Sequence, residues 1–385
     1  MPLPSPSDDA LEHSLRLSEH LRQRIRDAGG WLSFAAFMEA LLYAPGLGYY
    51  TAGAHKLGAA GDFVTAPELS PLFARSLTAP LRALMDASAP VLLEVGAGSG
   101  QLACDLLQAL EAEQALPEQY AILELSPDLR QRQQATLADS VPHLLSRIVW
   151  LDHMPERFKG AVVANEVLDA MPAHLVCWQA NGPQERGVAL DGEGQFIHAD
   201  QATQGALRQA AEEIAAQCPV APGYLSEISL ANRAWAAEWG HRLEQGGLLL
   251  IDYGFPRREF YHPQRTHGTL MCHYRHHAHP DPFYLPGLQD VTVHVDFTAI
   301  IAAAHPAGLD LLGYTTQGQF LLNTDILGHL ARIPNDSPDY IRASRAVNTL
   351  VMPHEMGELF KVIALGKGVA GPLPGFQQGD QAHRL

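Results

Sequence analysis

Along the middle of the chain, two patterns of apolar and polar residues follow each other in turn. Short apolar runs that close on a polar or acidic residue are separated by stretches in which apolar residues recur every three to four positions. The runs are typical of buried strands and the stretches of amphipathic helices, so the order predicts an α/β fold with a mostly parallel sheet. The predicted strands are 91–95, 120–125, 148–151, 161–164, 248–254, 311–316 and 359–365.

The pattern differs before and within this core. Before it, apolar spacing predicts a group of helices, the last of which begins at Ser70-Pro71. Residues 174–200 alternate like antiparallel strands, and Asn181-Gly182 is a hairpin signal. We therefore predict an inserted cap at 173–225 and, further on, a long loop rich in His, Pro and Tyr at 255–292.

These patterns predict five segments. They are N-terminal helices with a substrate and cofactor loop at 1–85, the first part of the core at 86–172, the cap at 173–225, the second part of the core at 226–370, and a flexible tail at 371–385.

Composition narrows the class of protein. The chain has 385 residues and a formal net charge of −16, which argues against a nucleic-acid backbone as main partner. The four cysteines are far apart without a CxxC pair, which fits a reducing compartment. No apolar run reaches membrane-spanning length, and residues 1–9 resemble neither a signal nor a transit peptide. We therefore expect a cytoplasmic protein that does not bind membranes.

A glycine-rich run follows the first predicted strand and opens a helix at 101–112. It reads Glu94-Val95-Gly96-Ala97-Gly98-Ser99-Gly100-Gln101. A dinucleotide-binding fingerprint would need Gly or Ala where Gln101 stands, and the Gly-Lys-Ser/Thr of a phosphate loop is absent. The run matches the acid-x-Gly-x-Gly-x-Gly signature of class I S-adenosylmethionine (SAM)-dependent methyltransferases. It therefore predicts a SAM site without a metal.

Acidic residues also end the next two strands. A carboxylate at Glu124 can accept hydrogen bonds from both ribose hydroxyls, and Asp152 is placed to meet the adenine. Each acid alone would be a solvated helix cap, but their register at successive strand ends favours a cofactor site. The cofactor candidates of the core are Glu94, Gly96, Ala97, Gly98, Gly100, Glu124, Leu125 and Asp152.

The segment after the fourth strand holds the candidate catalytic residues. It runs Asn165-Glu166-Val167-Leu168-Asp169-Ala170-Met171-Pro172. Glu166 and Asp169, together with Asn165, could orient a guanidinium nucleophile and accept its proton. An acid-rich helix start explains the same residues equally well.

Two sequence patterns resemble metal-binding motifs but lack the ligands that a metal site needs. His273, His276, His277 and His279 have no carboxylate or cysteine partners at zinc spacing, and an irregular loop explains them better. His354-Glu355 begins like H-E-x-x-H, but Glu358 stands at the fifth position. We expect no metal.

Several longer segments together resemble the MidA family of SAM-dependent methyltransferases, which is related to the mitochondrial complex I assembly factor. They are Gly48-Tyr49-Tyr50, the run from Gly61-Asp62-Phe63 to Pro67-Glu68, the glycine run, Asn165 to Pro172, Ile251 to Gly254, Asp290 to Phe297, and Met356 to Val362. The resemblance covers nearly the whole chain.

The resemblance implies a Rossmann-like class I methyltransferase fold with a seven-stranded sheet, an N-terminal helical extension and an inserted lobe. It further implies a protein substrate that bears arginine. By the same resemblance Thr65, Pro67 and Glu68 lie against SAM, and Asp62, Phe63, Tyr50, His294 and Asp296 form the substrate side. A methyltransferase of small molecules and a SAM-binding assembly chaperone without turnover stay open as alternatives, as does a homodimer.

Overall fold

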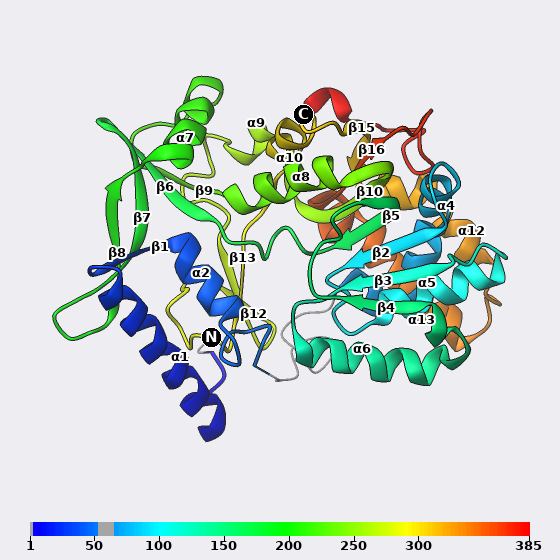
Figure 1. Ribbon diagram of the computed structural model, residues 1–385, viewed down its shortest axis with the longest axis horizontal. Coiled ribbons are helices and arrows are strands. Elements are labelled where there is room, and N and C mark those ends of the chain that lie inside the picture. Colours follow the sequence, from blue (N-terminus) through cyan, green and yellow to red (C-terminus); the bar gives the residue numbers. More distant parts are fainter. Residues whose placement is uncertain (1–2, 53–64) are drawn as a thin grey trace. The chain divides into compact units, whose positions relative to one another are not determined.

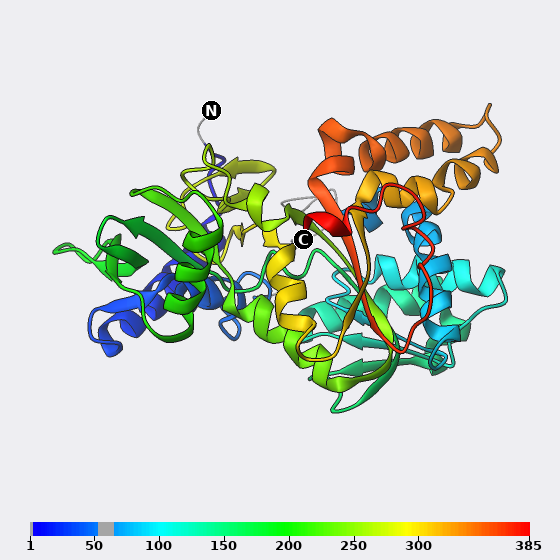
Figure 2. The same ribbon diagram turned by 90° about the horizontal axis from the view of Figure 1, so that it is seen from above.

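The structure is a computed structural model that describes residues 3–52 and 65–385 (Figures 1 and 2). The chain forms two compact units. Unit 1 consists of Met1–Phe63, Leu168–Trp235 and Phe255–Asp296, and unit 2 consists of Val64–Val167, Ala236–Gly254 and Phe297–Leu385.

Unit 2 contains the predicted central sheet. Its strands lie in the order β15-β16-β10-β5-β2-β3-β4. Neighbours from β10 to β4 are parallel, whereas β16 pairs antiparallel with both β10 and β15. The bounds are β2 Val91–Val95, β3 Gln119–Leu123, β4 Ile148–Leu151, β5 Phe158–Asn165, β10 Leu243–Phe255, β15 Asp310–Thr316 and β16 Phe360–Lys367. The predicted mostly parallel α/β sheet is confirmed.

Apolar side chains on both faces explain why these segments become strands. In β10, Leu248, Leu249 and Leu250 are fully buried, as expected for a strand covered on both sides. The helices of the unit begin where the sequence offers caps, as at Ser70, whose hydroxyl accepts a hydrogen bond from the Leu72 backbone N–H at 3.2 Å. The helices are α3 Ala66–Leu69, α4 Pro71–Asp86, α5 Gln101–Ala112, α6 Pro127–Ser140, α10 Phe297–Ala304, α11 Gln317–Asn323, α12 Ile326–Ala331 and α13 Pro338–Val351.

Unit 1 contains an antiparallel sheet in the order β1-β7-β6-β9, with β8 paired to β7. The predicted hairpin at Asn181-Gly182 joins β6 to β7. The bounds are β1 Trp31–Ser33, β6 His174–Gln179, β7 Gly182–Leu190, β8 Phe196–Ala202 and β9 Tyr224–Ile228, and the main helices are α1 Asp8–Asp27, α2 Phe34–Tyr43 and α7 Gly205–Gln217. Helix α8, Leu230–Arg242, runs from unit 1 into unit 2.

The prediction of one long loop at 255–292 is wrong. This segment contains α9, Arg257–Phe260, and a small antiparallel sheet in the order β12-β11-β13. The strands are β11 Met271–Tyr274, β12 His277–His279 and β13 Asp290–Thr292. Arg275 and His276 form the turn between β11 and β12 with φ of 47° and 62°, and such a turn matches the twist of a hairpin.

The bounds of the two units differ from those of the predicted segments. The structure separates residues 1–85 at Phe63 and places the cap, the N-terminal helices and 255–296 in one unit. The shared apolar core explains this grouping, because Leu17 and Phe37 of the helices pack in one buried cluster with Leu175 of the cap and Val291 of β13.

Candidate functional site

The glycine run forms a tight turn between β2 and α5 in unit 2. Gly96, Gly98 and Gly100 have φ of 67°, 54° and 86°, a region that residues with a Cβ rarely adopt. A Cβ on Gly96 would lie 3.0 Å from Cγ2 of Val167, and one on Gly100 would lie 3.1 Å from Cα of Gln133. Backbone conformation and close packing therefore both require glycine in this turn.

Glu94 lies beneath this turn at the end of β2. Its side chain is buried, with 2% of the residue exposed, and accepts a hydrogen bond from the Tyr120 hydroxyl at 2.6 Å. Burial raises the pKa of Glu94 to about 7, although the hydrogen bond from Tyr120 opposes that shift. Glu94 thus supports the turn from within the core.

Glu124 directly follows β3, where the predicted strand 120–125 included it, and it is also buried. Its Oε1 accepts a hydrogen bond from the Ser126 backbone N–H at 2.8 Å, and its Oε2 accepts one from Nε2 of Gln133 at 2.8 Å. Burial raises the pKa of this carboxyl, while these hydrogen bonds act in the opposite direction. The next residue, Leu125, is 72% exposed. A carboxylate that accepts hydrogen bonds, beside an exposed apolar side chain, fits the hydroxyl donors of a ribose and the apolar face of an adenine.

Asp152 is the most exposed of the candidate acids. Its side chain is 78% exposed, and its carboxylate forms an ion pair with Arg130 at 2.5 Å. Arg130 also donates hydrogen bonds to the carbonyls of Glu124 and Leu151 at 3.3 Å. Asp152 therefore anchors Arg130 at this edge of the sheet, and its contact with adenine stays a prediction.

Helix α3 brings the next candidates to the glycine turn. Thr65 stands at the N-cap of α3, and Pro67 is buried within it. The Ser99 hydroxyl donates a hydrogen bond to Oε1 of Glu68, which ties α3 to the turn. Asp62 and Phe63, which were expected on the substrate side, lie outside the described residues.

Glu166 follows β5 in an unusual backbone conformation, with φ of 54°. Its backbone N–H donates to the Ile251 carbonyl at 2.9 Å. Its Oε1 accepts hydrogen bonds from Nδ2 of Asn165 at 2.9 Å and from the Ala66 backbone N–H at 3.4 Å. A side chain fixed by two donors on a left-handed residue marks a strained position, and such positions cluster at functional sites.

A buried carboxylate that was not among the predicted site residues holds the backbone directly after Glu166. Asp252 of β10 accepts a hydrogen bond from the Val167 backbone N–H at 3.2 Å and another from the Tyr253 backbone N–H at 2.9 Å. The predicted site residues of unit 2 thus lie in the last residues of its parallel strands, on the segments that follow them, or at the short helix α3 that is tied to the glycine turn. This edge is the usual place for a ligand in open α/β sheets.

The catalytic candidate Asp169 and the substrate candidates Tyr50, His294 and Asp296 belong to unit 1. Asp169 is buried, and its carbonyl accepts a hydrogen bond from the Val293 backbone N–H at 3.0 Å. The Tyr50 hydroxyl donates to both carboxylate oxygens of Asp290 at 3.0 and 3.1 Å. Because Asp169 and Glu166 are in different units, their pairing stays a prediction.

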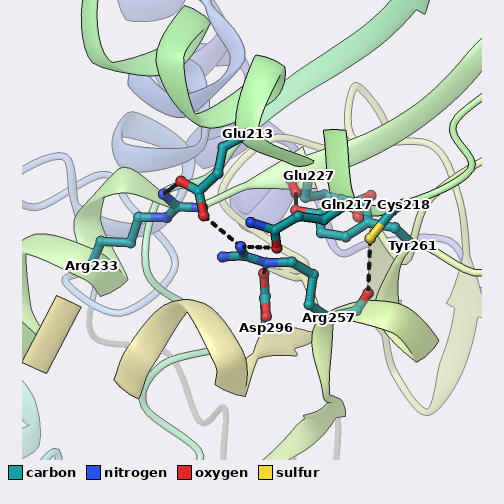
Figure 3. Close-up of polar contacts among 8 residues, drawn as sticks. All are labelled: Glu213, Gln217, Cys218, Glu227, Arg233, Arg257, Tyr261 and Asp296. Carbon is teal, nitrogen blue, oxygen red and sulfur yellow. Dashed lines mark hydrogen bonds and ion pairs between the residues drawn. The ribbon is translucent and has the colours of Figure 1, made fainter. Parts of the chain in front are cut away.

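Asp296 is bound by an arginine of its own unit (Figure 3). Its Oδ2 lies 3.3 Å from Nε of the buried Arg257, whose Nη1 donates hydrogen bonds to Glu213 at 2.6 Å and to Gln217 at 2.9 Å. The neighbouring His294 stacks on Phe255 with ring centroids 5.4 Å apart. Asp296 therefore joins β14, Val295–Asp296, to α7 and α9 through one guanidinium, a partner that no pattern in the sequence indicated.

Between residues 3–52 and 65–385, no three His, Cys, Asp or Glu side chains are placed to hold a metal ion. In the same part of the chain, no helix has the length and apolar composition needed to cross a membrane.

Comparisons with known proteins place these features in context. A family model described as "Putative S-adenosyl-L-methionine-dependent methyltransferase" matches residues 72–315. A crystal structure from Burkholderia thailandensis, described as a "likely methyl transferase" bound to S-adenosyl-homocysteine, is 49% identical, covers 100% of both chains and has a TM-score of 0.96.

Similar curated proteins are more distant in sequence. The mitochondrial protein arginine methyltransferase NDUFAF7 of Danio rerio is 29% identical and aligns over 90% of this chain and 86% of its own. Its homolog in Drosophila melanogaster is 27% identical over 95% and 88% of the two chains.

Proposed function

The chain belongs to this family of SAM-dependent methyltransferases, and on that premise we propose that it methylates the guanidinium of arginine in a protein. The resemblance to the MidA family and the prediction of a SAM-dependent enzyme are confirmed. Arginine is supported by the relatives named as protein arginine methyltransferases, which align over most of their length. The net charge of −16 suits a cationic substrate.

We propose that the cofactor lies at the carboxyl edge of the unit 2 sheet. The glycine turn would lie beneath its amino-acid portion, Glu124 would accept the ribose hydroxyls, and Leu125 would contact the adenine. Thr65, Pro67, Glu68 and Asp152 complete this proposed set. When bound, SAM supplies an activated methyl group on a sulfonium, so the chain's own residues must align a nucleophile and exclude water.

The observation that carries the catalytic proposal is the fixed position of Glu166. Two hydrogen bonds from Asn165 and Ala66 hold its Oε1, and the hydrogen bond from Val167 to Asp252 fixes the following residue. A carboxylate fixed in this way can accept an N–H of a guanidinium and localise its charge on one side. The attacking nitrogen then presents a lone pair toward the methyl group.

The proton balance defines what Glu166 must do. The bond between the nitrogen and the methyl carbon forms as the bond from the sulfonium sulfur breaks, and the attacking nitrogen gives up one proton. We propose that Glu166 accepts the hydrogen bond of that N–H and takes up its proton as the new N–C bond forms. The product guanidinium keeps its positive charge.

Replacing Glu166 tests this role. Glu166→Gln keeps the shape of the side chain but removes its charge, so SAM binding should persist while methyl transfer falls by roughly 100-fold or more. Calorimetry with SAM and tritium transfer from labelled SAM measure the two quantities separately. The exposed Glu156 provides the matched control, because Glu156→Gln should leave both unchanged. Undiminished transfer in Glu166→Gln would contradict the proposed role.

The acceptor itself is identified by labelling. A lysate from a strain that lacks this protein is incubated with tritiated SAM and the purified enzyme, and labelled species are analysed by mass spectrometry. Methylarginine in a protein supports the proposal. Label in small molecules alone, or binding of SAM without any transfer, contradicts it.

A further inference from the structure

We propose that Gln133 is a positioning residue of the cofactor site, which holds the glycine turn and the Glu124 carboxylate in one arrangement. Gln133 belongs to α6 and is fully buried. The inference rests on the proposed role of Glu124 in binding ribose.

One side-chain amide of Gln133 joins three segments of unit 2. Its Nε2 donates to the Gly98 carbonyl at 3.1 Å and to Oε2 of Glu124 at 2.8 Å. Its Oε1 accepts a hydrogen bond from the indole N–H of Trp150 in β4 at 3.0 Å. The glycine turn, the end of β3 and β4 are thus connected through a single group.

Trp150 fixes which way the amide is turned. An indole N–H can only donate, so the oxygen of Gln133 must face Trp150. The two N–H groups must then face Gly98 and Glu124, both of which present acceptors. The donor and acceptor sets therefore match in one orientation, and the amide cannot rotate without breaking all three hydrogen bonds.

The backbone of Gln133 also packs against the glycine turn. A Cβ on Gly100 would lie 3.1 Å from Cα of Gln133 and 3.5 Å from its Cβ. Both the helix and its side chain therefore contact the glycine turn, Gly100 by packing and Gly98 by a hydrogen bond. The position of α6 and the conformation of the turn are coupled at this residue.

The hydrogen bond from Gln133 also affects the charge of Glu124. Burial raises the pKa of Glu124, whereas the N–H groups of Ser126 and Gln133 lower it. Arg130 of α6 also lowers this pKa, and Glu94 of β2 is the like charge nearby. Gln133 thus helps to keep Glu124 ionised, and the ionised form accepts hydrogen bonds from two hydroxyl groups.

Two substitutions test this arrangement. Gln133→Met keeps the length of the side chain and removes every hydrogen bond, and Gln133→Glu keeps an acceptor for Trp150 but places a second carboxylate beside Glu124. The exposed Gln134 of the same helix provides the control, as Gln134→Met. Affinity for S-adenosyl-homocysteine is measured by calorimetry between pH 5 and 8.5, and Trp fluorescence is recorded in parallel.

We expect both Gln133 variants to bind S-adenosyl-homocysteine roughly 10- to 100-fold more weakly at neutral pH, since hydrogen bonds to a buried charge are lost. The pH below which binding is lost should move upward in both variants, and the emission of Trp150 should change. In a Glu124→Gln background, the additional loss from Gln133→Met should be much smaller, because the positioned carboxylate is gone.

The outcomes separate the two proposals. If the unmodified enzyme fails to bind S-adenosyl-homocysteine, the assigned cofactor site is wrong. If it binds but the Gln133 variants keep its affinity and pH profile, the positioning role is wrong. A loss that is the same with and without Glu124 also overturns it, and the pH profile of Gln133→Glu decides the question if Gln133→Met does not fold.

Discussion

Glu94 makes the stability of this enzyme depend on pH in a direction opposite to that of most carboxylates. Burial raises its pKa from 4.5 to about 7, so the folded chain holds the proton more tightly than the unfolded chain. Below pH 4.5 both states are protonated and Glu94 contributes no difference. Between pH 4.5 and about 7 only the unfolded state ionises, so the free energy of unfolding falls as the pH rises.

The magnitude follows from the two pKa values. At about 1.4 kcal/mol per pKa unit, the gap between 4.5 and about 7 amounts to about 3 kcal/mol of stability lost by pH 8. Glu94→Gln removes the titrating group and keeps an oxygen that can accept the hydrogen bond from Tyr120. The variant should therefore gain stability relative to the unmodified enzyme as the pH rises, and the gain should level off above pH 7.

Urea unfolding at intervals between pH 4.5 and 8.5 measures this difference. Glu118→Gln, the same substitution at an exposed position, serves as the matched control. If the difference between Glu94→Gln and the unmodified enzyme is flat across this range, Glu94 titrates in the folded state as it does in the unfolded state. The argument from burial would then be refuted.

Two further predictions concern glycines. Gly98→Val should abolish SAM binding in calorimetry because a branched side chain is strained at φ of 54°. Gly194 has φ of 78° and open space around it, so Gly194→Val should leave binding intact. Equal binding in both variants would contradict the assignment of the turn. Gly268→Ala should lower the free energy of unfolding by roughly 2 to 3 kcal/mol in urea titrations, because its Cβ would lie 2.2 Å from Oε1 of Glu227, a carboxylate that two backbone N–H groups already hold. Gly223→Ala has a similar φ and no such contact, so it should cost only about 1 kcal/mol, and equal costs would show that the contact is relieved.

The core of unit 2 could be predicted because its determinants are local. The apolar run of β2 and the glycines after it define the strand, the turn and the start of α5 without reference to the rest of the chain. A hairpin was also predicted near Asn181-Gly182, and β6 pairs with β7 there, with Gly182 as the first residue of β7 opposite Gln179.

The rest depends on contacts between segments that are far apart in sequence. The strands β11 and β12 are short and their turn residues, Arg275 and His276, are not those usual in a tight hairpin, so composition indicated a loop. Arg257 binds Asp296 across 39 positions, and Gln133 reaches Gly98 across 35. A buried glutamine on a helix gives no sign in the sequence of which groups it will bond.

The position of β16 in the sheet has a consequence for synthesis on the ribosome. This strand lies between β10 and β15, yet it is Phe360–Lys367, close to the end of the chain. Until it emerges, the backbone groups of β10 that pair with β16 around Leu248–Ile251 lack that partner strand. Such an edge is a template for pairing with other chains, so a stalled or truncated product that ends before residue 360 should aggregate and depend on chaperones.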